Sequence, residues 1–143
     1  MKDGSPRRSR RARHQAQTDA LDLTFQAADL PLVRRRTASW ALRAGMPADA
    51  ADDFVIAVNE IATNAVRHGS PEATLRLWVE GRAGLAEISD QGYWASAASA
   101  APPPRRRAEY GGMGLEVARM VCDGLQISAA KSGTAVRLRM SLA

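Results

Sequence analysis

The pattern of apolar and polar positions is clearest in the middle of the chain. Apolar side chains recur there at intervals of three and four residues, at Phe54, Val58, Ile61 and Ala65. This spacing places them on one stripe of a helix, and such a stripe is typical of a helix that packs on a hydrophobic core. The pattern therefore predicts an amphipathic helix over residues 52–68.

A row of polar side chains runs along the flank of that predicted helix. Glu60, Asn64 and His68 follow one another at intervals of four residues, so they share one side of the helix. A polar row beside a core-facing stripe can present chemistry to a cleft, but on its own it equally describes a solvated helix edge. His68 is interpreted as structural, because a cation in the last turn suits the negative end of the helix dipole. Carboxylates are expected to cap the start of the helix, at Asp49, Asp52 or Asp53.

The rest of the pattern consists of short alternating segments and two further helices. Alternation of apolar and polar positions predicts strands over residues 21–27, 73–80, 85–89, 125–129 and 135–140. Helical spacing predicts one helix between Asp29 and Gly45 and another over residues 115–122. Strands joined in hairpins, with helices gathered between them, favour an α+β fold. We expect a two-layer sandwich in which a mostly antiparallel mixed sheet carries helices on one face.

Positive charge is concentrated at the start of the chain. Residues 1–20 hold six basic and two acidic side chains, which is +4 of the total formal charge of +5. Because this segment has almost no apolar side chains, it is expected to be a disordered tail, and residues 21–143 are expected to form a single domain. The tail is interpreted as a solvated appendage, and weak contact with nucleic acid or an acidic partner is the alternative.

Composition excludes several classes of function. No run of about eighteen apolar residues exists, so no membrane span is expected, and the start of the chain lacks the apolar segment of a signal peptide. The single cysteine, Cys122, is interpreted as a small buried apolar residue. With only His14 and His68 beside it, it cannot complete a closed zinc site. The Gly-x-x-x-x-Gly-Lys sequence of a P-loop is also missing. A cytoplasmic protein is the resulting expectation.

One long segment has no periodic pattern. Residues 93–111 are rich in Ala, Ser and Pro, and they contain three prolines followed by three arginines at 102–107. A loop of this length inside one domain is typically a lid, a binding loop or a disordered insert. Its position between two glycine-containing motifs favours a lid. The three arginines either contact phosphates or an acidic partner, or they form an exposed solubilising cluster.

Four short motifs follow one another in a defined order. They are Glu60-x-x-x-Asn64 on a helix, Asp90-Gln91-Gly92 after a strand, Gly111-Gly112-Met113-Gly114-Leu115 at the opening of a helix, and Gly133-Thr134 at the opening of the last strand. In this order they resemble the GHKL (Bergerat-fold) ATP-binding superfamily. Among its members, the small bacterial anti-sigma-factor serine/threonine kinases are the nearest likeness. The resemblance extends from about Leu21 to the C-terminus.

The resemblance implies a nucleotide site with a role for each motif. Asn64 matches the family's Mg²⁺ ligand, and an amide oxygen suits this hard cation. Glu60 matches the general base, which takes the proton from a serine hydroxyl during in-line attack on the γ-phosphate of ATP. Asp90 matches the carboxylate that accepts a hydrogen bond from the adenine amino group. Gly92 lets the backbone pass close to that base.

The second glycine motif and the last strand complete the implied site. Gly112 and Gly114 match the loop whose backbone N–H groups meet the phosphates near a helix N-terminus. Thr134 matches a threonine that supports the contact between adenine and Asp90. One position departs from the family pattern, because Trp94 stands where the first glycine motif usually has a second glycine. This departure bears on phosphoryl transfer more than on nucleotide binding.

The resemblance implies an anti-sigma factor that is also a Mg·ATP-dependent protein serine kinase. Such a protein sequesters a sigma factor and phosphorylates a STAS-type anti-anti-sigma partner that competes for it, and it commonly forms a homodimer. Two alternatives remain. One is a catalytically inactive nucleotide- or partner-binding regulator with the same fold. The other is a nucleic-acid-binding protein that uses the arginines of residues 7–13.

Overall fold

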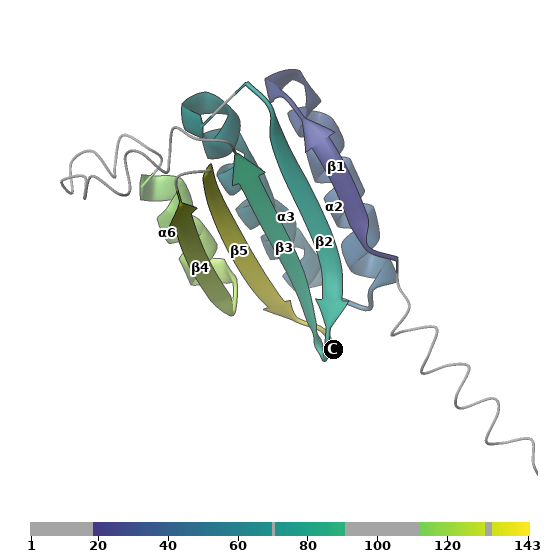
Figure 1. The fold of residues 1–143 in the computed structure, drawn as a ribbon. Helices are drawn as coiled ribbons and strands as arrows, with labels where there is room; N and C mark the ends of the chain where they lie inside the picture. The colour runs from purple at the N-terminus through teal and green to yellow at the C-terminus, as the bar shows by residue number, and fades with distance from the viewer. Residues whose placement is uncertain (1–18, 70, 91–111, 131–132) are drawn as a thin grey trace, which may run out of the picture.

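A sheet of five strands and three α-helices make up the part of the chain that the computed structural model describes, residues 19–69, 71–90, 112–130 and 133–143 (Figure 1). The elements in chain order are β1 (Leu21–Phe25), the 3-10 helix η1 (Ala27–Asp29), α2 (Leu30–Arg43), α3 (Ala48–Asn64), the π-helical η2 (Ala65–Gly69), β2 (Ala73–Glu80), β3 (Ala83–Asp90), α6 (Gly112–Val121), β4 (Gly124–Ala130) and β5 (Gly133–Ser141). None of these helices is both long and apolar enough to cross a membrane. Almost all of the predicted tail and the whole of the predicted lid lie outside the described residues.

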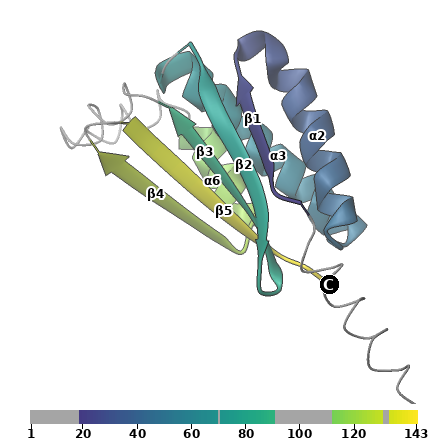
Figure 2. The ribbon, with the colours of Figure 1, turned by 45° about the vertical axis from the view of Figure 1, so that its right-hand side comes forward.

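The strands form one sheet in the order β1-β2-β3-β5-β4. All four pairings among these strands are antiparallel. Helices α2, α3 and α6 lie together on one face of the sheet, as the two views in Figures 1 and 2 show. The predicted α+β sandwich, with a mostly antiparallel sheet and helices on one face, is confirmed.

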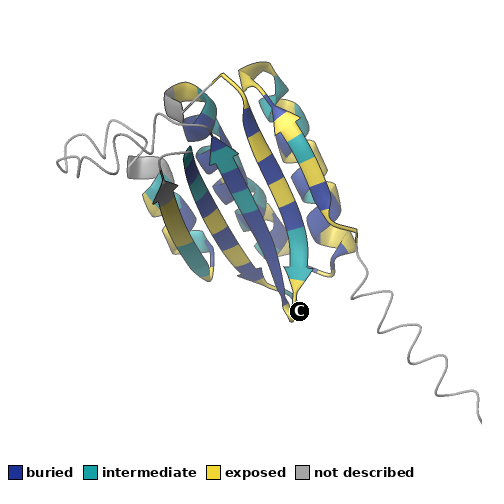
Figure 3. Ribbon diagram, viewed as in Figure 1, coloured by how far each residue is buried: buried dark blue, intermediate teal, exposed yellow. Residues whose placement is uncertain are grey.

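Strand β2 illustrates why one face of the sheet is buried and the other open. Leu75 and Leu77 are fully buried on the helix-facing side, whereas Thr74 before them and Arg76 between them are exposed. Figure 3 shows the same alternation as bands along β2 and β5. Successive side chains of a strand point to opposite faces, so the alternation read from the sequence determines which face meets the helices. The central strand β3 is buried along most of its length.

The core lies between the sheet and the hairpin of α2 and α3. Trp40 of α2 and Phe54 of α3 are fully buried, and their rings stack with centroids 6.4 Å apart. Trp40 Nε1 donates a hydrogen bond to the Asp19 backbone carbonyl at 2.9 Å, so the one polar atom of the indole is satisfied. All four apolar positions of the predicted α3 stripe are buried, which confirms that stripe.

The ends of α3 differ from the sequence prediction. The helix begins at Ala48, and its N-cap residue Pro47 makes no side-chain cap hydrogen bond, so the predicted carboxylate cap is wrong. The reason is that the Pro47 carbonyl accepts a hydrogen bond from Ala51 N at 2.8 Å, which starts the helix before the expected aspartates. The α-helical segment ends at Asn64, and the remaining predicted helix is the π-helical turn η2. Such turns are frequent at functional sites.

Gly84 lies where β3 passes under the α2–α3 hairpin. A Cβ atom at this position would be 3.0 Å from Met46 Cε and 3.3 Å from Trp40 Cζ3. Gly84→Ala is therefore expected to lower the free energy of unfolding by about 1–2 kcal/mol, because the added methyl group overpacks the core. Gly124→Ala is the matched control, since its Cβ would meet Arg139 Cβ at an ordinary 3.6 Å. Urea unfolding measures both variants, and equal losses of stability would contradict the close packing at Gly84.

Candidate active site

The described parts of all four sequence motifs lie at one end of the sheet. The end of β3, the start of β5, η2 and the start of α6 all lie at this end in Figure 1. η2 contacts β2 and β3, and α3 packs against α6 and β5. The fold therefore brings the C-terminal turns of α3 next to the ends of two sheet strands.

Glu60 and Asn64 occupy the last turns of α3, on the side that faces α6. Asp53 lies seven residues before Glu60, and Glu60 lies four residues before Asn64, so the three residues share one side of α3. The charge of Asp53 raises the pKa of the Cys122 thiol. Because Cys122 directly follows α6, this side of α3 faces α6. Asn64 is only 5% exposed, whereas Glu60 is half-buried. The Asn64 amide at the buried end can hold a ligand oxygen. The Glu60 carboxylate at the accessible end can accept a proton.

Asp90 and Thr134 lie opposite each other in the sheet. The register of β3 and β5 pairs their Cα positions, and the residues are 7% and 3% exposed. They continue the helix-facing rows of these strands, directly beyond the buried pair Ile88 and Val136. Thr134 Oγ1 is buried and has no hydrogen-bond partner among the described residues. A buried hydroxyl without a partner is costly, so this position suits a polar group of a ligand or a water molecule.

The glycine motifs are placed only in part. Gly112 is the first residue of α6, and Gly114 lies in its first turn. The backbone N–H groups of a first turn have no partner within the helix, and they favour an anion. Gly92 and Trp94 lie outside the described residues, so their predicted roles stay predictions.

The residues that can be placed fit a magnesium nucleotide. A buried carboxylate suits the amino group of an adenine, and the Thr134 hydroxyl beside it has no partner in the described part of the chain. The start of α6 suits phosphate oxygens, and the Asn64 amide oxygen suits a hard cation.

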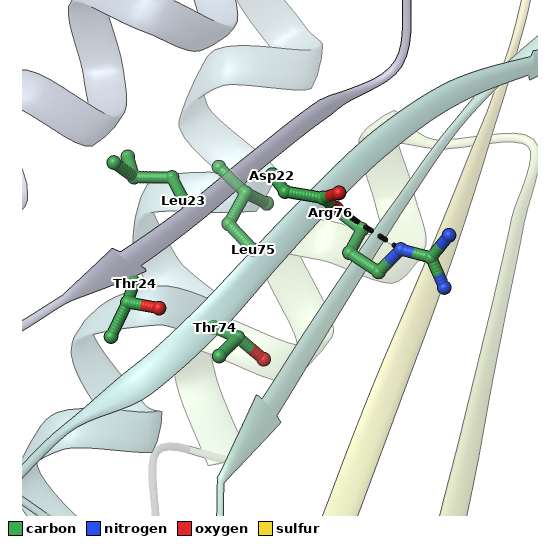
Figure 4. Close-up of a pocket in the computed structure, with 6 residues that line it drawn as sticks. All are labelled: Asp22, Leu23, Thr24, Thr74, Leu75 and Arg76. Atoms are coloured by element: carbon green, nitrogen blue, oxygen red, sulfur yellow. Dashed lines mark hydrogen bonds and ion pairs between the residues drawn. The ribbon is translucent and has the colours of Figure 1, made fainter.

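Two hollows lie on the open face of the sheet, away from these residues. One, of about 320 Å³, is lined by β1 and β2, by Asp22, Leu23, Thr24, Thr74, Leu75 and Arg76 (Figure 4). Across it, Arg76 Nε donates to Asp22 Oδ1 at 3.1 Å, so its two charged groups already pair with each other. The second hollow, of about 210 Å³, lies between the far ends of β2–β5. Neither contains a predicted site residue.

Cys122 is buried beside the core and is expected to be unreactive. Burial, followed by the charges of Asp123 and Asp53, raises the pKa of its thiol from its ordinary value of 9.0 to about 12.

Because only the thiolate reacts, alkylation of the folded protein near pH 8 is expected to be at least about a hundredfold slower than that of the unfolded chain. The raised pKa also contributes stability below pH 9 that is lost as the pH rises toward 12. Alkylation that is quenched at intervals and followed by mass spectrometry measures the rates. Cys122→Ala is the control, because it should take no label and should lack this pH dependence of stability. Equal alkylation of folded and unfolded chains would contradict the burial.

Sequence comparison assigns the chain to a family. A profile of the histidine kinase-like ATPase domain family matches residues 23–140, which is most of the chain. The chain therefore belongs to the histidine kinase-like ATPase domain family, and the recognition made from the four motifs is confirmed. Membership of an ATPase domain family implies that the protein binds ATP. None of the curated proteins compared with this sequence matches it.

Two solved structures share the fold. The crystal structure of the RsbU and RsbW domains of Rv1364c from Mycobacterium tuberculosis is 22% identical, has a TM-score of 0.67, and aligns over 87% of this chain and 32% of that chain. A chain in the crystal structure of the SiaB–SiaC complex from Pseudomonas aeruginosa is 10% identical and has a TM-score of 0.62. The alignment covers 96% of this chain and 97% of that chain. This chain thus spans about a third of the length of the Mycobacterium tuberculosis protein. At these identities the likeness establishes the fold alone.

Proposed function

We propose that this protein is a cytoplasmic anti-sigma factor and a Mg·ATP-dependent protein serine kinase. In this role it sequesters a sigma factor, and it releases that factor when a STAS-type anti-anti-sigma protein competes for binding. Phosphorylation of a serine on the competitor then restores sequestration. The proposal includes a homodimer and rests on the four motifs, on family membership and on the fold shared with the RsbW-containing structure.

The observation that carries the nucleotide part of the proposal is the buried pair Asp90 and Thr134. The Asp90 carboxylate is buried at the end of β3, and its oxygens are acceptors that suit the amino group of an adenine. The unsatisfied Thr134 hydroxyl beside it completes the recognition of the base edge. A site that hydrogen-bonds one particular polar group discriminates strongly against a base that lacks it.

Glu60 and Asn64 support phosphoryl transfer rather than binding alone. The Asn64 amide oxygen would hold Mg²⁺, whose charge offsets that of the phosphates. Glu60 is half-buried one turn earlier, so its carboxylate can meet a hydroxyl that a partner protein brings to the γ-phosphate. It accepts the hydroxyl proton as the serine oxygen attacks. The N–H groups at the start of α6 hold phosphate oxygens.

The second candidate function is a catalytically inactive regulator with the same fold. The observation that favours it is Trp94, which replaces a glycine in the first glycine motif. In this case nucleotide binding, if retained, only alters the shape of the partner-binding surface.

Calorimetric titration of the purified protein with ATP, with and without Mg²⁺, tests the proposal. Magnesium-dependent binding of ATP, followed by transfer of labelled γ-phosphate to a serine of a STAS-type protein, is the expected result. ADP, which lacks the γ-phosphate, is the control for transfer. Binding without transfer to any such protein identifies the inactive regulator, and no ATP binding at all overturns the proposed nucleotide site.

A further inference from the structure

Strand β4 forms one edge of the sheet, and no described strand pairs with its outer side. Its residues, Gly124–Ala130, include no charged residue and no proline. An exposed edge strand can pair with another strand through its free backbone N–H and C=O groups, and proteins usually protect such edges with charges, proline or a covering element. The sequence predicts β4 only as a strand, and the strand order of the sheet places it at the edge.

The apolar side of the sheet ends at β4 with a side chain that is not buried. On the helix-facing side, the strand registers align four apolar residues across four strands: Leu75, Ile88, Val136 and Ile127. The first three are 0%, 2% and 3% exposed, whereas Ile127 is 41% exposed. Helix α6 packs chiefly against α3, so it leaves this last position of the row partly uncovered.

The opposite edge of the sheet is covered within the chain. Strand β1 has five residues, and one of them is the charged Asp22, which pairs with Arg76. Its helix-facing residues Leu21 and Phe25 are 6% and 1% exposed, because α2 packs against this strand (Figure 2). The edge at β4 thus differs from the edge at β1, since it leaves apolar surface for a further strand.

The sequence of β4 is self-complementary about its centre. Ile127 is the middle residue of Gly124–Ala130, so a two-fold axis through it sets Ile127 opposite itself in an antiparallel pair. Gln126, which is exposed on the open face, then lies opposite the exposed Ser128 of the second copy. Apolar positions meet apolar positions, polar positions meet polar positions, and no like charges oppose each other.

We propose that β4 pairs with β4 of a second copy of this chain, antiparallel and about a two-fold axis at Ile127. The two five-stranded sheets then form one continuous sheet. The row that ends at Ile127 continues into the second copy, and both isoleucines become buried between the two chains. Because each chain uses its own β4 edge, the assembly closes at two copies. The proposal rests on the homodimer of the proposed function, to which it gives a surface.

This pairing separates the two candidate active sites. Each site lies at the end of the sheet where β4 finishes, since Ala129 of β4 pairs with Thr134 of β5. An antiparallel partner runs in the opposite direction, so its site lies at the other end of the continuous sheet. Disrupting the dimer is therefore expected to leave nucleotide binding by each chain unchanged.

Ile127→Lys tests the pairing, because it removes the apolar contact and sets two lysines opposite each other at the axis. Analytical ultracentrifugation of the full chain measures the dissociation constant of the dimer. Ile127→Lys is expected to raise this constant by at least about tenfold. Ile56→Lys is the matched control, since Ile56 is a 47% exposed isoleucine on α3. It should leave the constant within about twofold of wild type.

Cysteine cross-linking tests the register of the pair. Position 126 lies directly opposite position 128 of the second copy, where Cβ atoms are about 4.5–5.5 Å apart, whereas the two copies of position 126 are about 7–8 Å apart. A mixture of Gln126→Cys and Ser128→Cys chains, oxidised with copper phenanthroline, should therefore form a disulfide between chains. Either variant alone should form it at least about tenfold more slowly. Wild type is the control, because its single cysteine, Cys122, is buried.

Four outcomes would overturn the proposal. They are a monomeric wild type, which would leave the edge to a strand of a different protein, a series of larger assemblies, a dissociation constant unchanged by Ile127→Lys, and equal cross-linking of the mixed and single cysteine variants. A wild-type dimer that resists Ile127→Lys keeps the homodimer of the proposed function and loses only the β4 pairing. Calorimetric titration with ATP separates the two proposals further, since a β4-paired dimer that binds no ATP keeps the pairing and loses the nucleotide site.

Discussion

Glu60→Gln is expected to lower the rate of phosphoryl transfer from ATP to a partner's serine by about a hundredfold to ten-thousandfold. The amide has nearly the shape of the carboxylate, but it cannot accept the hydroxyl proton. Since Glu60 is half-buried, the change removes a base without opening a cavity. Transfer of labelled γ-phosphate under single-turnover conditions measures the rate of the chemical step.

The same variant should bind Mg·ATP within about twofold of wild type, because the proposed base contacts the incoming hydroxyl rather than the nucleotide. Asp52→Asn is the matched control, since Asp52 is an exposed acid on the same helix, two turns away. It should transfer phosphate at the wild-type rate. Undiminished transfer by Glu60→Gln would remove the catalytic role from this residue.

Asp90→Asn is expected to weaken ATP binding by about ten- to a hundredfold. A hydrogen bond to a buried charged acceptor contributes about 1.5–3 kcal/mol, and the substitution removes that charge. The residue is 7% exposed at the end of β3, so water cannot easily replace the lost acceptor. Calorimetric titration with ATP and with GTP measures the effect on both bases.

The comparison of the two nucleotides makes this test specific. The carboxylate disfavours the guanine carbonyl, whereas an amide can donate to it, so the preference for ATP over GTP should narrow in Asp90→Asn. Glu87→Gln alters an acid of the same strand on the open face, where it pairs with Arg137, and it should leave both affinities unchanged. An unaltered ATP affinity in Asp90→Asn would place the adenine elsewhere.

The sequence predicted the elements well where periodicity was strong. The α3 stripe, the alternating strand β2 and the helix that starts at the second glycine motif all agree with the structure. In these segments the hydrophobic pattern is long enough to select one period over the other. The first turn of α3 was misjudged, because the aspartates that resemble caps lie inside a helix that Pro47 starts. A backbone carbonyl provides that start, and side-chain patterns carry no signal for it.

The candidate site was predictable only as a set of motifs. Glu60 and Asn64 share a helix side, which four-residue spacing alone indicates. The role of Thr134 could not be read in this way, since a threonine in a strand has many reasons to be there. The family resemblance pointed to it, and the structure adds its burial opposite Asp90 and a hydroxyl that lacks a partner among the described residues.

By itself the sequence determined the local structure and the family, because helical and strand periods and short motifs depend on neighbouring residues. The tertiary structure decided which distant residues meet. The antiparallel register of β3 and β5 places Asp90 opposite Thr134, and the packing of α2 on α3 joins Arg34 to Asn59. These pairings depend on strand order and helix packing, which are set by burial of the whole core rather than by any one segment.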